Sequence, residues 1–211
     1  MSQIDTKEKI LDVAEELFAK TGYQGTSMRA ITSLDGVNLA AINYHFGSKQ
    51  RLVTAVVERR LLPLNKLREQ GLLAAKEKAA RAGKKPGVAE VLLAFIEPTM
   101  LLPESAPGAS NFISLIGRAM ADPDETARNI FIQNMKPIIK LFYACLAEAL
   151  PEIPKDVLYW RLNFVIGSLS HTMRPIGQCP VHMAEAGAPE PRSLAQLLMP
   201  FSAAGMGAPR W

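Results

Sequence analysis

The sequence predicts an all-α fold of about nine helices, with a small three-helix domain over residues 1–47 and a larger helical domain over residues 48–211. Apolar residues recur at spacings of three and four along nearly the whole chain, and no stretch alternates as a half-buried strand does. All 15 prolines lie from Pro63 onward, so regular short helices are expected before that point and kinked or segmented helices after it. With 211 residues, 48% of them hydrophobic and 21% charged, the chain is an ordinary globular protein of one or two domains.

The first helix is predicted over residues 6–21. Asp5 and Glu8 form an opening similar to a capping box, and Gly22 is a typical residue just past a helix end. Glu15 and Glu16 are expected on its exposed side. Its apolar face comprises Ile10, Ala14, Leu17 and Phe18.

A second and a third helix follow in close succession. Thr26 or Ser27 can cap the second helix, which ends at residues 35–36, and Asn38 can cap the third, over residues 39–46. Two short helices joined by a tight turn that contains glycine form a helix-turn-helix motif.

The third helix has an unusual composition for a core element. Ile42 and Phe46 can face inward, whereas most of its other side chains are polar, small or aromatic and remain outside. A following helix starts at residues 47–49, where Lys49 would suit a phosphate oxygen. Each of these residues alone is typical of a solvated surface, but their combination predicts that the first domain binds DNA through the third helix.

The charge distribution is compatible with that prediction. Residues 1–60 hold 8 Lys and Arg against 7 Asp and Glu, and residues 61–90 hold 7 against 3, whereas residues 91–211 hold 9 against 10. The basic excess therefore lies in the first 90 residues, which permits nucleic-acid binding without proving it.

Residues 26–31 (TSMRAI), 36–38 (GVN) and 43–49 (NYHFGSK) resemble the N-terminal signature of TetR-family transcriptional regulators. The resemblance covers about residues 6–60 and implies a regulator that binds a double-stranded DNA operator, most often as a repressor. A homodimer on an inverted repeat is expected, because one short recognition helix needs a second copy to gain specificity. It assigns phosphate contacts to Thr26, Tyr44 and Lys49. Base or groove contacts fall on Arg29, Asn38, Leu39, Ala41 and His45, while Ser27 and Asn43 complete the predicted DNA-binding set, with Asn43 either reading a base or only packing.

A narrower resemblance joins the chain to the fatty-acid-responsive, PsrA-like branch of that family. It is carried by residues 31–33, 36–41, 111–118 (NFISLIGR) and 198–206 (LMPFSAAGM). The branch implies repression of fatty-acid degradation genes, or control of a stress or stationary-phase regulator, relieved by a long-chain fatty acid or its thioester.

Further helices are predicted at about 49–80, 87–102, 109–121, 124–150, 155–177 and 191–205. Pro98 and Pro137 should kink two of them, and kinked helices leave space for a cavity that binds a small hydrophobic effector. Most apolar side chains there should simply be core. The candidate effector-binding residues are Phe95, Met100, Phe112, Ile116, Arg118, Met120, Phe131, Met135, Phe142, Phe164 and His171. A carboxylate would need a polar anchor, and the candidates are Arg118, which follows an apolar helix face, His171, Arg174 and Asn163.

The last two long helices are expected to form the contact between two protomers. One apolar stripe comprises Leu158, Leu162, Val165 and Leu169, and the other comprises Leu194, Leu197, Leu198 and Phe201. The alternative is that both stripes pack only within one chain.

Other function classes find little support in the sequence. No Gly-x-Ser-x-Gly elbow, P-loop or dinucleotide fingerprint is present, so we expect no enzyme, no catalytic residue and no cofactor. Cys179 and His182 supply only two of the four ligands of a structural zinc site, so no metal is expected. With two cysteines, no secretory signal and no apolar run of ~20 residues, the chain should be cytoplasmic and should not enter a membrane. The alternatives are a helical lipid carrier without DNA binding and a repressor that responds to an aromatic, drug-like effector.

Overall fold

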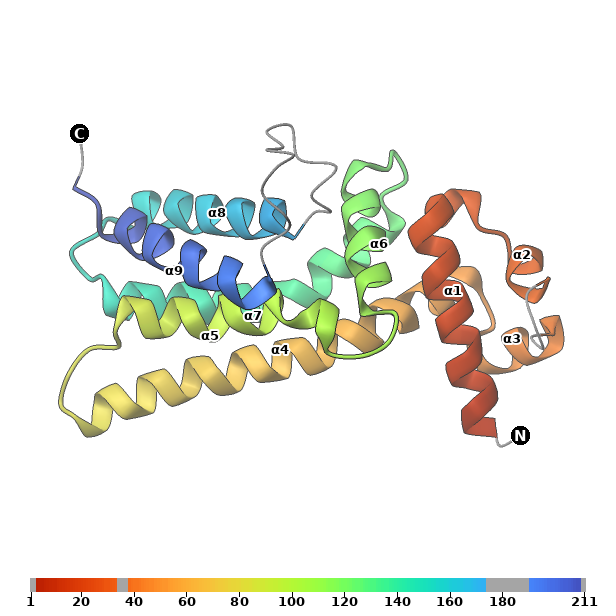
Figure 1. The fold of residues 1–211 in the computed structure, drawn as a ribbon, viewed down its shortest axis with the longest axis horizontal. Coiled ribbons are helices and arrows are strands. Elements are labelled where there is room, and N and C mark those ends of the chain that lie inside the picture. The colour runs from red at the N-terminus through yellow and green to blue at the C-terminus, as the bar shows by residue number, and fades with distance from the viewer. Residues whose placement is uncertain (1–2, 34–37, 174–189, 210–211) are drawn as a thin grey trace. The chain divides into compact units, whose positions relative to one another are not determined.

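The computed structural model describes residues 3–33, 38–173 and 190–209 of the chain (Figure 1). Within these ranges every regular element is helical, which confirms the all-α prediction. The elements are α1 (Gln3–Gly25), α2 (Met28–Thr32), α3 (Leu39–Phe46), α4 (Lys49–Arg81), α5 (Val88–Met100), a 3₁₀ turn η1 (Leu102–Glu104), α6 (Ala109–Ala121), α7 (Thr126–Ala149), α8 (Lys155–Thr172) and α9 (Pro191–Gly207).

The chain packs into two compact units. Unit 1 comprises residues 1–63 and 103–135, and unit 2 comprises residues 64–102 and 136–211. The helices α4 and α7 therefore run through both units, and α6 belongs to the same unit as α1 because the two helices pack against each other extensively. The predicted boundary lay between residues 47 and 48. The division by packing differs, because unit 1 also includes the start of α4, to residue 63, and residues 103–135.

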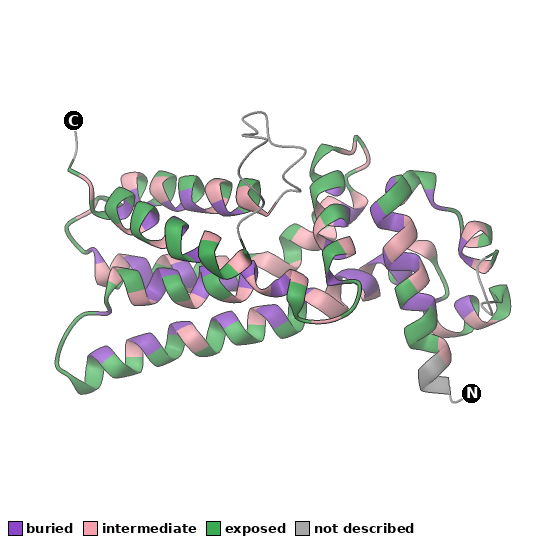
Figure 2. Cartoon of the chain, in the orientation of Figure 1, coloured by how far each residue is buried: buried purple, intermediate pink, exposed green. Residues whose placement is uncertain are grey.

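The core of unit 1 comes from one side of each of its helices (Figure 2). Its buried side chains include Ile10, Phe18, Ile31, Ile42, Phe46, Leu52, Val53, Val56, Phe112 and Leu115. Gly22 adopts a positive φ of 76°, which breaks the regular helix where the sequence predicts its end, and α1 resumes briefly to Gly25. A side chain at Gly22 would also meet α6, because an ideal Cβ there would lie 3.1 Å from Cδ of Arg118.

Glu15 corrects one expectation about α1. Its side chain is only 2% exposed, since its carboxylate accepts hydrogen bonds from Arg59 and Arg60 of α4. Arg60 also donates to the carbonyl of Pro107 at 2.8 Å, and Arg59 reaches Asp12 at 2.7 Å. An acidic residue expected in solvent thus joins α1 to α4, whereas its neighbour Glu16 is on the surface and pairs with Lys20.

In unit 2, α5 packs on α9, and α9 packs on α8. The rings of Phe95 and Phe142 stack with centroids 4.3 Å apart, and the Arg68 guanidinium lies 4.4 Å from the centroid of Phe95. The apolar stripe of α8 expected between protomers is instead buried within this unit. It comprises Leu158, Leu162, Val165 and Leu169.

None of the helices in the described ranges is both long and apolar enough to cross a membrane.

Candidate nucleic-acid interface

Side-chain caps at two helix starts build the interface from α2 and α3. Ser27 Oγ accepts a hydrogen bond of 3.0 Å from the backbone N–H of Ala30, and Asn38 Oδ1 accepts one of 2.7 Å from the N–H of Ala41. Both caps were expected from the sequence. Each satisfies a backbone donor that the first turn of a helix leaves without an intrahelical partner. The turn residues 34–37 lie outside the described part of the chain.

The α3 helix has an inner and an outer face, as predicted. Ile42 and Phe46 are buried, and the outer face carries Tyr44, 74% exposed, and Leu39, 43% exposed. His45 is half-buried and meets the ring of Tyr44 edge-on, with centroids 5.1 Å apart. Arg29, Asn38 and Asn43 are exposed too, and Ala41 is half-buried.

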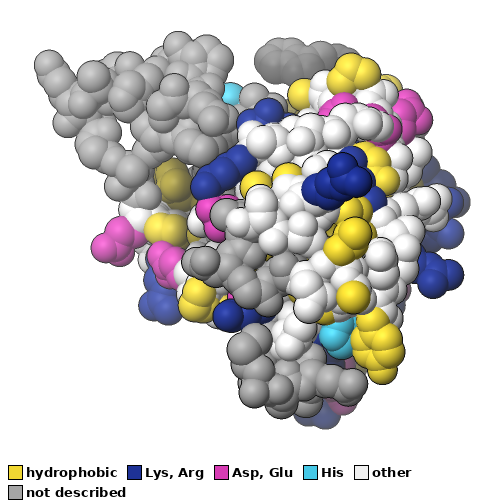
Figure 3. Space-filling view, turned by 90° about the vertical axis from the view of Figure 1, so that its right-hand side faces the viewer, with side chains coloured by type: hydrophobic (Ala, Val, Ile, Leu, Met, Phe, Trp, Pro, Cys, Tyr) yellow, Lys and Arg dark blue, Asp and Glu magenta, His cyan; other side chains and the backbone are white. Residues whose placement is uncertain are grey.

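Figure 3 shows basic, hydrophobic and histidine side chains on one face of the molecule. An exposed, capped short helix with such a surface can enter a DNA groove and present its first turns to base edges.

Lys49 begins α4 beside this face. Its ammonium lies 4.3 Å from the centroid of the Tyr23 ring. Burial lowers the pKa of Lys49 below its ordinary value, and the negative charge of Asp124 acts in the opposite direction. Ser48 Oγ accepts a hydrogen bond of 3.2 Å from the N–H of Arg51, so this start of a helix is capped as well. The exposed side chain of Arg51 was not predicted, although its place two residues after Lys49 gives it a similar position for phosphate.

Thr26 does not lie on the surface with the other predicted contacts. Its side chain is 1% exposed, and its hydroxyl bonds to the carbonyl of Gly22 at 2.8 Å and to the hydroxyl of Thr21 at 2.8 Å. This position is at odds with the predicted phosphate contact, because the hydroxyl is used to hold the chain between α1 and α2. Sequence resemblance cannot separate these two roles of a threonine.

The predicted effector-binding residues do not gather in one compact unit. Unit 2 holds Phe95, Met100, Phe142, Phe164 and His171, while unit 1 holds Phe112, Ile116, Arg118, Met120, Phe131 and Met135. The buried members are Phe95, Met100, Phe112 and Phe142; Ile116, Phe131 and Met135 are half-buried; and Arg118, Met120, Phe164 and His171 are exposed. The set is therefore a mixture of core and surface.

The predicted carboxylate anchors also differ from their expected positions. Arg118 Nε donates to the carbonyl of Ala19 at 3.2 Å, so its guanidinium holds α6 on α1. His171 and Asn163 are exposed on α8, and Arg174 lies outside the described residues. Arg68, which the sequence did not single out, is buried beside Phe95 and donates to the hydroxyl of Thr99 at 2.7 Å, and this burial lowers its pKa to about 9.

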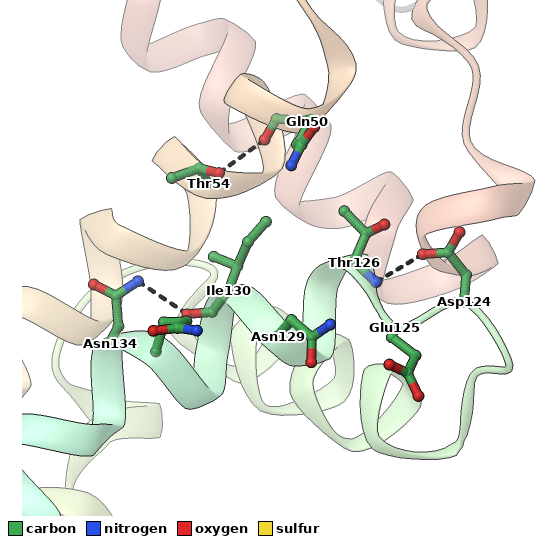
Figure 4. Close-up of a pocket in the computed structure, with 9 residues that line it drawn as sticks. Gln50, Thr54, Asp124, Glu125, Thr126, Asn129, Ile130 and Asn134 are labelled. Carbon is green, nitrogen blue, oxygen red and sulfur yellow. Dashed lines mark hydrogen bonds between the residues drawn. The ribbon is translucent and has the colours of Figure 1, made fainter.

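Unit 1 also contains a hollow of about 470 Å³, lined mostly by polar residue types, between the start of α4 and the start of α7 (Figure 4). Its lining residues are Gln50, Thr54, Asp124, Glu125, Thr126, Asn129, Ile130, Gln133 and Asn134. In the described ranges no three His, Cys, Asp or Glu side chains come together as a metal site would need, and Cys179 and His182 lie outside those ranges.

Comparisons with known proteins agree with this architecture. The regulator YttP of Bacillus subtilis is 40% identical over 55 residues, and QacR of Staphylococcus aureus is 37% identical over 54 residues. Each alignment covers 26% of this chain and 27% and 29%, respectively, of the relative, so the likeness is confined to about a quarter of each protein.

Solved structures match over nearly the whole length. FadR of Bacillus subtilis in complex with stearoyl-CoA has a TM-score of 0.69 at 14% identity, covering 94% of this chain and 98% of that one. A TerR/AcrR-family regulator of Aquifex aeolicus has a TM-score of 0.61 at 24% identity, covering 93% and 96%. At these identities the likeness shows the fold.

Two family models match the chain. One, described as bacterial regulatory proteins of the tetR family, matches residues 10–56, which include α2, α3 and Lys49. The other, a tetracyclin repressor-like C-terminal domain, matches residues 93–205, which is more than half of the chain. The chain therefore belongs to the TetR family of helix-turn-helix transcriptional regulators.

Proposed function

We propose that the protein is a transcriptional repressor that binds an inverted-repeat operator as a homodimer and is released by a hydrophobic effector. The observation that carries this proposal is the exposed outer face of α3, held by the Asn38 cap and the buried Ile42 and Phe46, with Lys49 beside it. One helix of eight residues reads few base pairs, so a second copy is needed for useful specificity.

The contacts divide into two kinds. Lys49 and Tyr44 contact phosphates and give affinity for any sequence, whereas Arg29 and Asn38 contact base edges and give preference for the operator. The test is binding of labelled DNA from the upstream region of the coding sequence, measured by fluorescence anisotropy over a range of salt concentrations. Lys49→Ala should weaken binding to all sequences alike and reduce the salt slope by about one for each half-site.

Lys84→Ala is the control, because it removes a lysine charge from unit 2; Lys84 is exposed, whereas Lys49 is half-buried. Unchanged affinity and unchanged salt dependence in Lys49→Ala would contradict the phosphate contact. Complete lack of operator binding by the native chain would favour the alternative of a helical carrier that does not bind DNA.

The homodimer is proposed to form through an aromatic surface on α8 and α9. Trp160 and Phe164 are 60% and 65% exposed on α8, and their rings lie 6.5 Å apart. Leu197 and Phe201 are exposed on the adjoining helix α9, to which α8 is packed. Large apolar side chains exposed together in this way are typical of an interface between proteins. This surface replaces the buried stripe of α8 in the predicted contact.

The dimer is tested by the mass in solution. Trp160→Glu with Phe164→Glu should give a monomer in sedimentation at micromolar concentrations, because a charge at the centre of an apolar interface is costly. Leu73→Glu, at an exposed leucine of α4 in the same unit, should leave the mass unchanged. A native chain that is monomeric across micromolar concentrations would contradict the homodimer.

The effector is proposed to be a long-chain fatty acid or its thioester bound within unit 2. Support comes from the aromatic and methionine side chains Phe95, Phe142 and Met100, and from the buried cation of Arg68, which would suit a carboxylate or phosphate head. The FadR structure with a TM-score of 0.69 holds stearoyl-CoA. An aromatic, drug-like effector is the second candidate, since the same side chains would stack on it.

Oleate, oleoyl-CoA and a planar aromatic cation should be titrated separately into the complex with operator. Release by oleate or its thioester below the micellar concentration, and loss of that response in Arg68→Met, is the expected result. Release by the aromatic compound alone would favour the second candidate and leave DNA binding intact.

A further inference from the structure

The segment between α6 and α7 contacts the end of α1. The Gln24 side-chain amide donates a hydrogen bond to the carboxylate of Asp124, one hundred positions later in the chain. The same carboxylate accepts a bond of 2.8 Å from the N–H of Thr126, the first residue of α7 (Figure 4), and the N–H of Asp124 donates to Asp122 Oδ1 at 2.9 Å. Asp124 is thus fixed at the helix start and directed toward α1, all within unit 1.

Tyr23, the residue before Gln24, contacts Lys49. The Lys49 ammonium lies over the ring of Tyr23, at 4.3 Å from its centroid. Burial lowers the pKa of Lys49 and raises the pKa of Tyr23, and the negative charge of Asp124 opposes the first shift and adds to the second. Tyr23 and Gln24 therefore connect the proposed phosphate-binding lysine to a carboxylate on the α6–α7 segment.

We propose that Asp124 is a positioning residue for operator binding: its carboxylate, fixed by Gln24 and Thr126, attracts Lys49 toward Tyr23 and competes with an operator phosphate for that lysine. The inference rests on the phosphate contact proposed for Lys49 and adds the residue that controls it. Movement of residues 122–126 changes the negative charge that Lys49 experiences, and so changes the affinity for operator.

The competition follows from elementary electrostatics. A lysine near a fixed carboxylate is already partly neutralised, so it releases fewer counterions from DNA when it meets a phosphate. Removal of the negative charge should therefore strengthen binding to every sequence rather than weaken it. The gain should be largest at low salt, because added salt screens interactions between partly exposed charges.

Asp124→Asn tests the proposal. Asparagine, like aspartate, accepts a hydrogen bond from the backbone N–H two residues later, so it keeps an oxygen for the N–H of Thr126 and the fold should be retained. The expected result is operator binding about two- to five-fold tighter for each half-site at low salt, with a steeper salt slope. Lys49 and Asp124 interact through their charges and not through a direct ion pair in the described structure, so the energy of an exposed ion pair sets the upper limit of the gain. Random-sequence DNA should show the same gain.

Two further variants separate this role from a general change of charge. Glu125→Gln removes an equal charge one residue later, from a carboxylate that pairs with Arg128, and should change affinity much less. In a Lys49→Ala background, Asp124→Asn should have no effect on affinity, since the carboxylate acts through the lysine. Circular dichroism melts check that each variant is folded.

The outcomes distinguish the two proposals. If Lys49→Ala weakens binding but Asp124→Asn changes nothing, weakens binding, or acts equally with and without Lys49, the role of Asp124 is wrong while the proposed function stands. If Lys49→Ala itself has no effect on affinity or salt slope, the proposed phosphate contact fails first. Tighter binding in Asp124→Asn that disappears without Lys49 supports both.

Discussion

The carboxylate of Glu15 gives the sharpest test of how unit 1 is held together. It accepts hydrogen bonds from Arg60 Nε at 3.0 Å and from Arg60 Nη2 at 2.9 Å, and another from Arg59 Nη2. The side chains of Glu15, Arg60 and Arg59 are only 2%, 11% and 15% exposed. Glu15→Gln keeps the size of the side chain and removes the only negative charge that both guanidiniums share in the described structure.

The expected loss follows from this burial. Removal of one partner from a buried ion pair costs about 3–5 kcal/mol, because the remaining charge cannot return to water. The charge concerned is that of Arg60, since Arg59 keeps Asp12 at 2.7 Å. A domain of this size has a free energy of unfolding of about 5–15 kcal/mol, so the loss is a large fraction of it. At roughly 2–4 °C per kcal/mol, the melting temperature of the transition that includes unit 1 should fall by roughly 6–20 °C.

Differential scanning calorimetry and urea unfolding measure the effect. The adjacent Glu16→Gln is the matched control, since the 2.5 Å pair between Glu16 and Lys20 is exposed and is expected to contribute only about 0.3–0.5 kcal/mol. A loss below about 1 kcal/mol in Glu15→Gln, or equal losses in the two variants, would refute the reasoning that the buried cluster holds α4 on α1.

Three more results follow from single residues. Ser202 is buried and its hydroxyl has no hydrogen-bond partner within the described structure, so Ser202→Ala should raise the free energy of unfolding in urea by about 1 kcal/mol, and a loss would contradict that assignment. Asn38→Ala removes the cap of α3 and should lower the melting temperature by an amount equivalent to about 1 kcal/mol while weakening operator binding, whereas Asn163→Ala on α8 should not affect DNA. Burial raises the pKa of the Cys145 thiol, so alkylation of this thiol in a Cys179→Ser background should be slow and should still accelerate above pH 9. Unfolding in urea should make the reaction fast. Rapid alkylation of Cys145 in the folded Cys179→Ser chain at neutral pH would contradict its burial.

The helices themselves were largely predictable, because their ends depend on local chemistry. Ser27 and Asn38 cap α2 and α3 as expected, and Gly22 takes the positive φ that makes glycine common at helix ends. The inner face of α3 follows from the spacing of Ile42 and Phe46. These features need only neighbours within one or two turns, which a sequence shows directly.

Glu15 shows what local chemistry leaves out. Two adjacent acidic residues look alike in the sequence, yet one is buried against arginines 44 and 45 positions later, and the other is in solvent. Thr26 is a similar case, since its hydroxyl bonds to Gly22 and Thr21 rather than facing outward. Partners that are brought together only by the tertiary fold leave no periodic signal.

The predicted outer faces of the last two helices fared differently: Leu197 and Phe201 of the predicted α9 stripe are exposed, whereas the predicted α8 stripe is buried. Periodicity identifies the stripe that contains Leu158 and Leu162, but an apolar stripe can face the same chain or another protein with equal ease. The structure buries that stripe and exposes Trp160 and Phe164 on the other side of the helix. For the same reason the predicted effector-binding set includes side chains that belong to the core. Arg68 was missed because nothing in the sequence around a single arginine indicates that it is buried.

The segments that form unit 1 suggest how a ligand could change DNA binding. Residues 103–135 belong to the same unit as α1 to α3, although the C-terminal family model includes them. Within that unit Arg118 bonds to Ala19 and Asp124 bonds to Gln24, so two contacts from the later segment reach α1 without passing along α4. A shift of α6 can therefore alter the surroundings of Lys49 directly. It follows that substitutions at Arg118 and Asp124 should change operator affinity even without an effector, whereas substitutions at Arg68 should change it only when an effector is present.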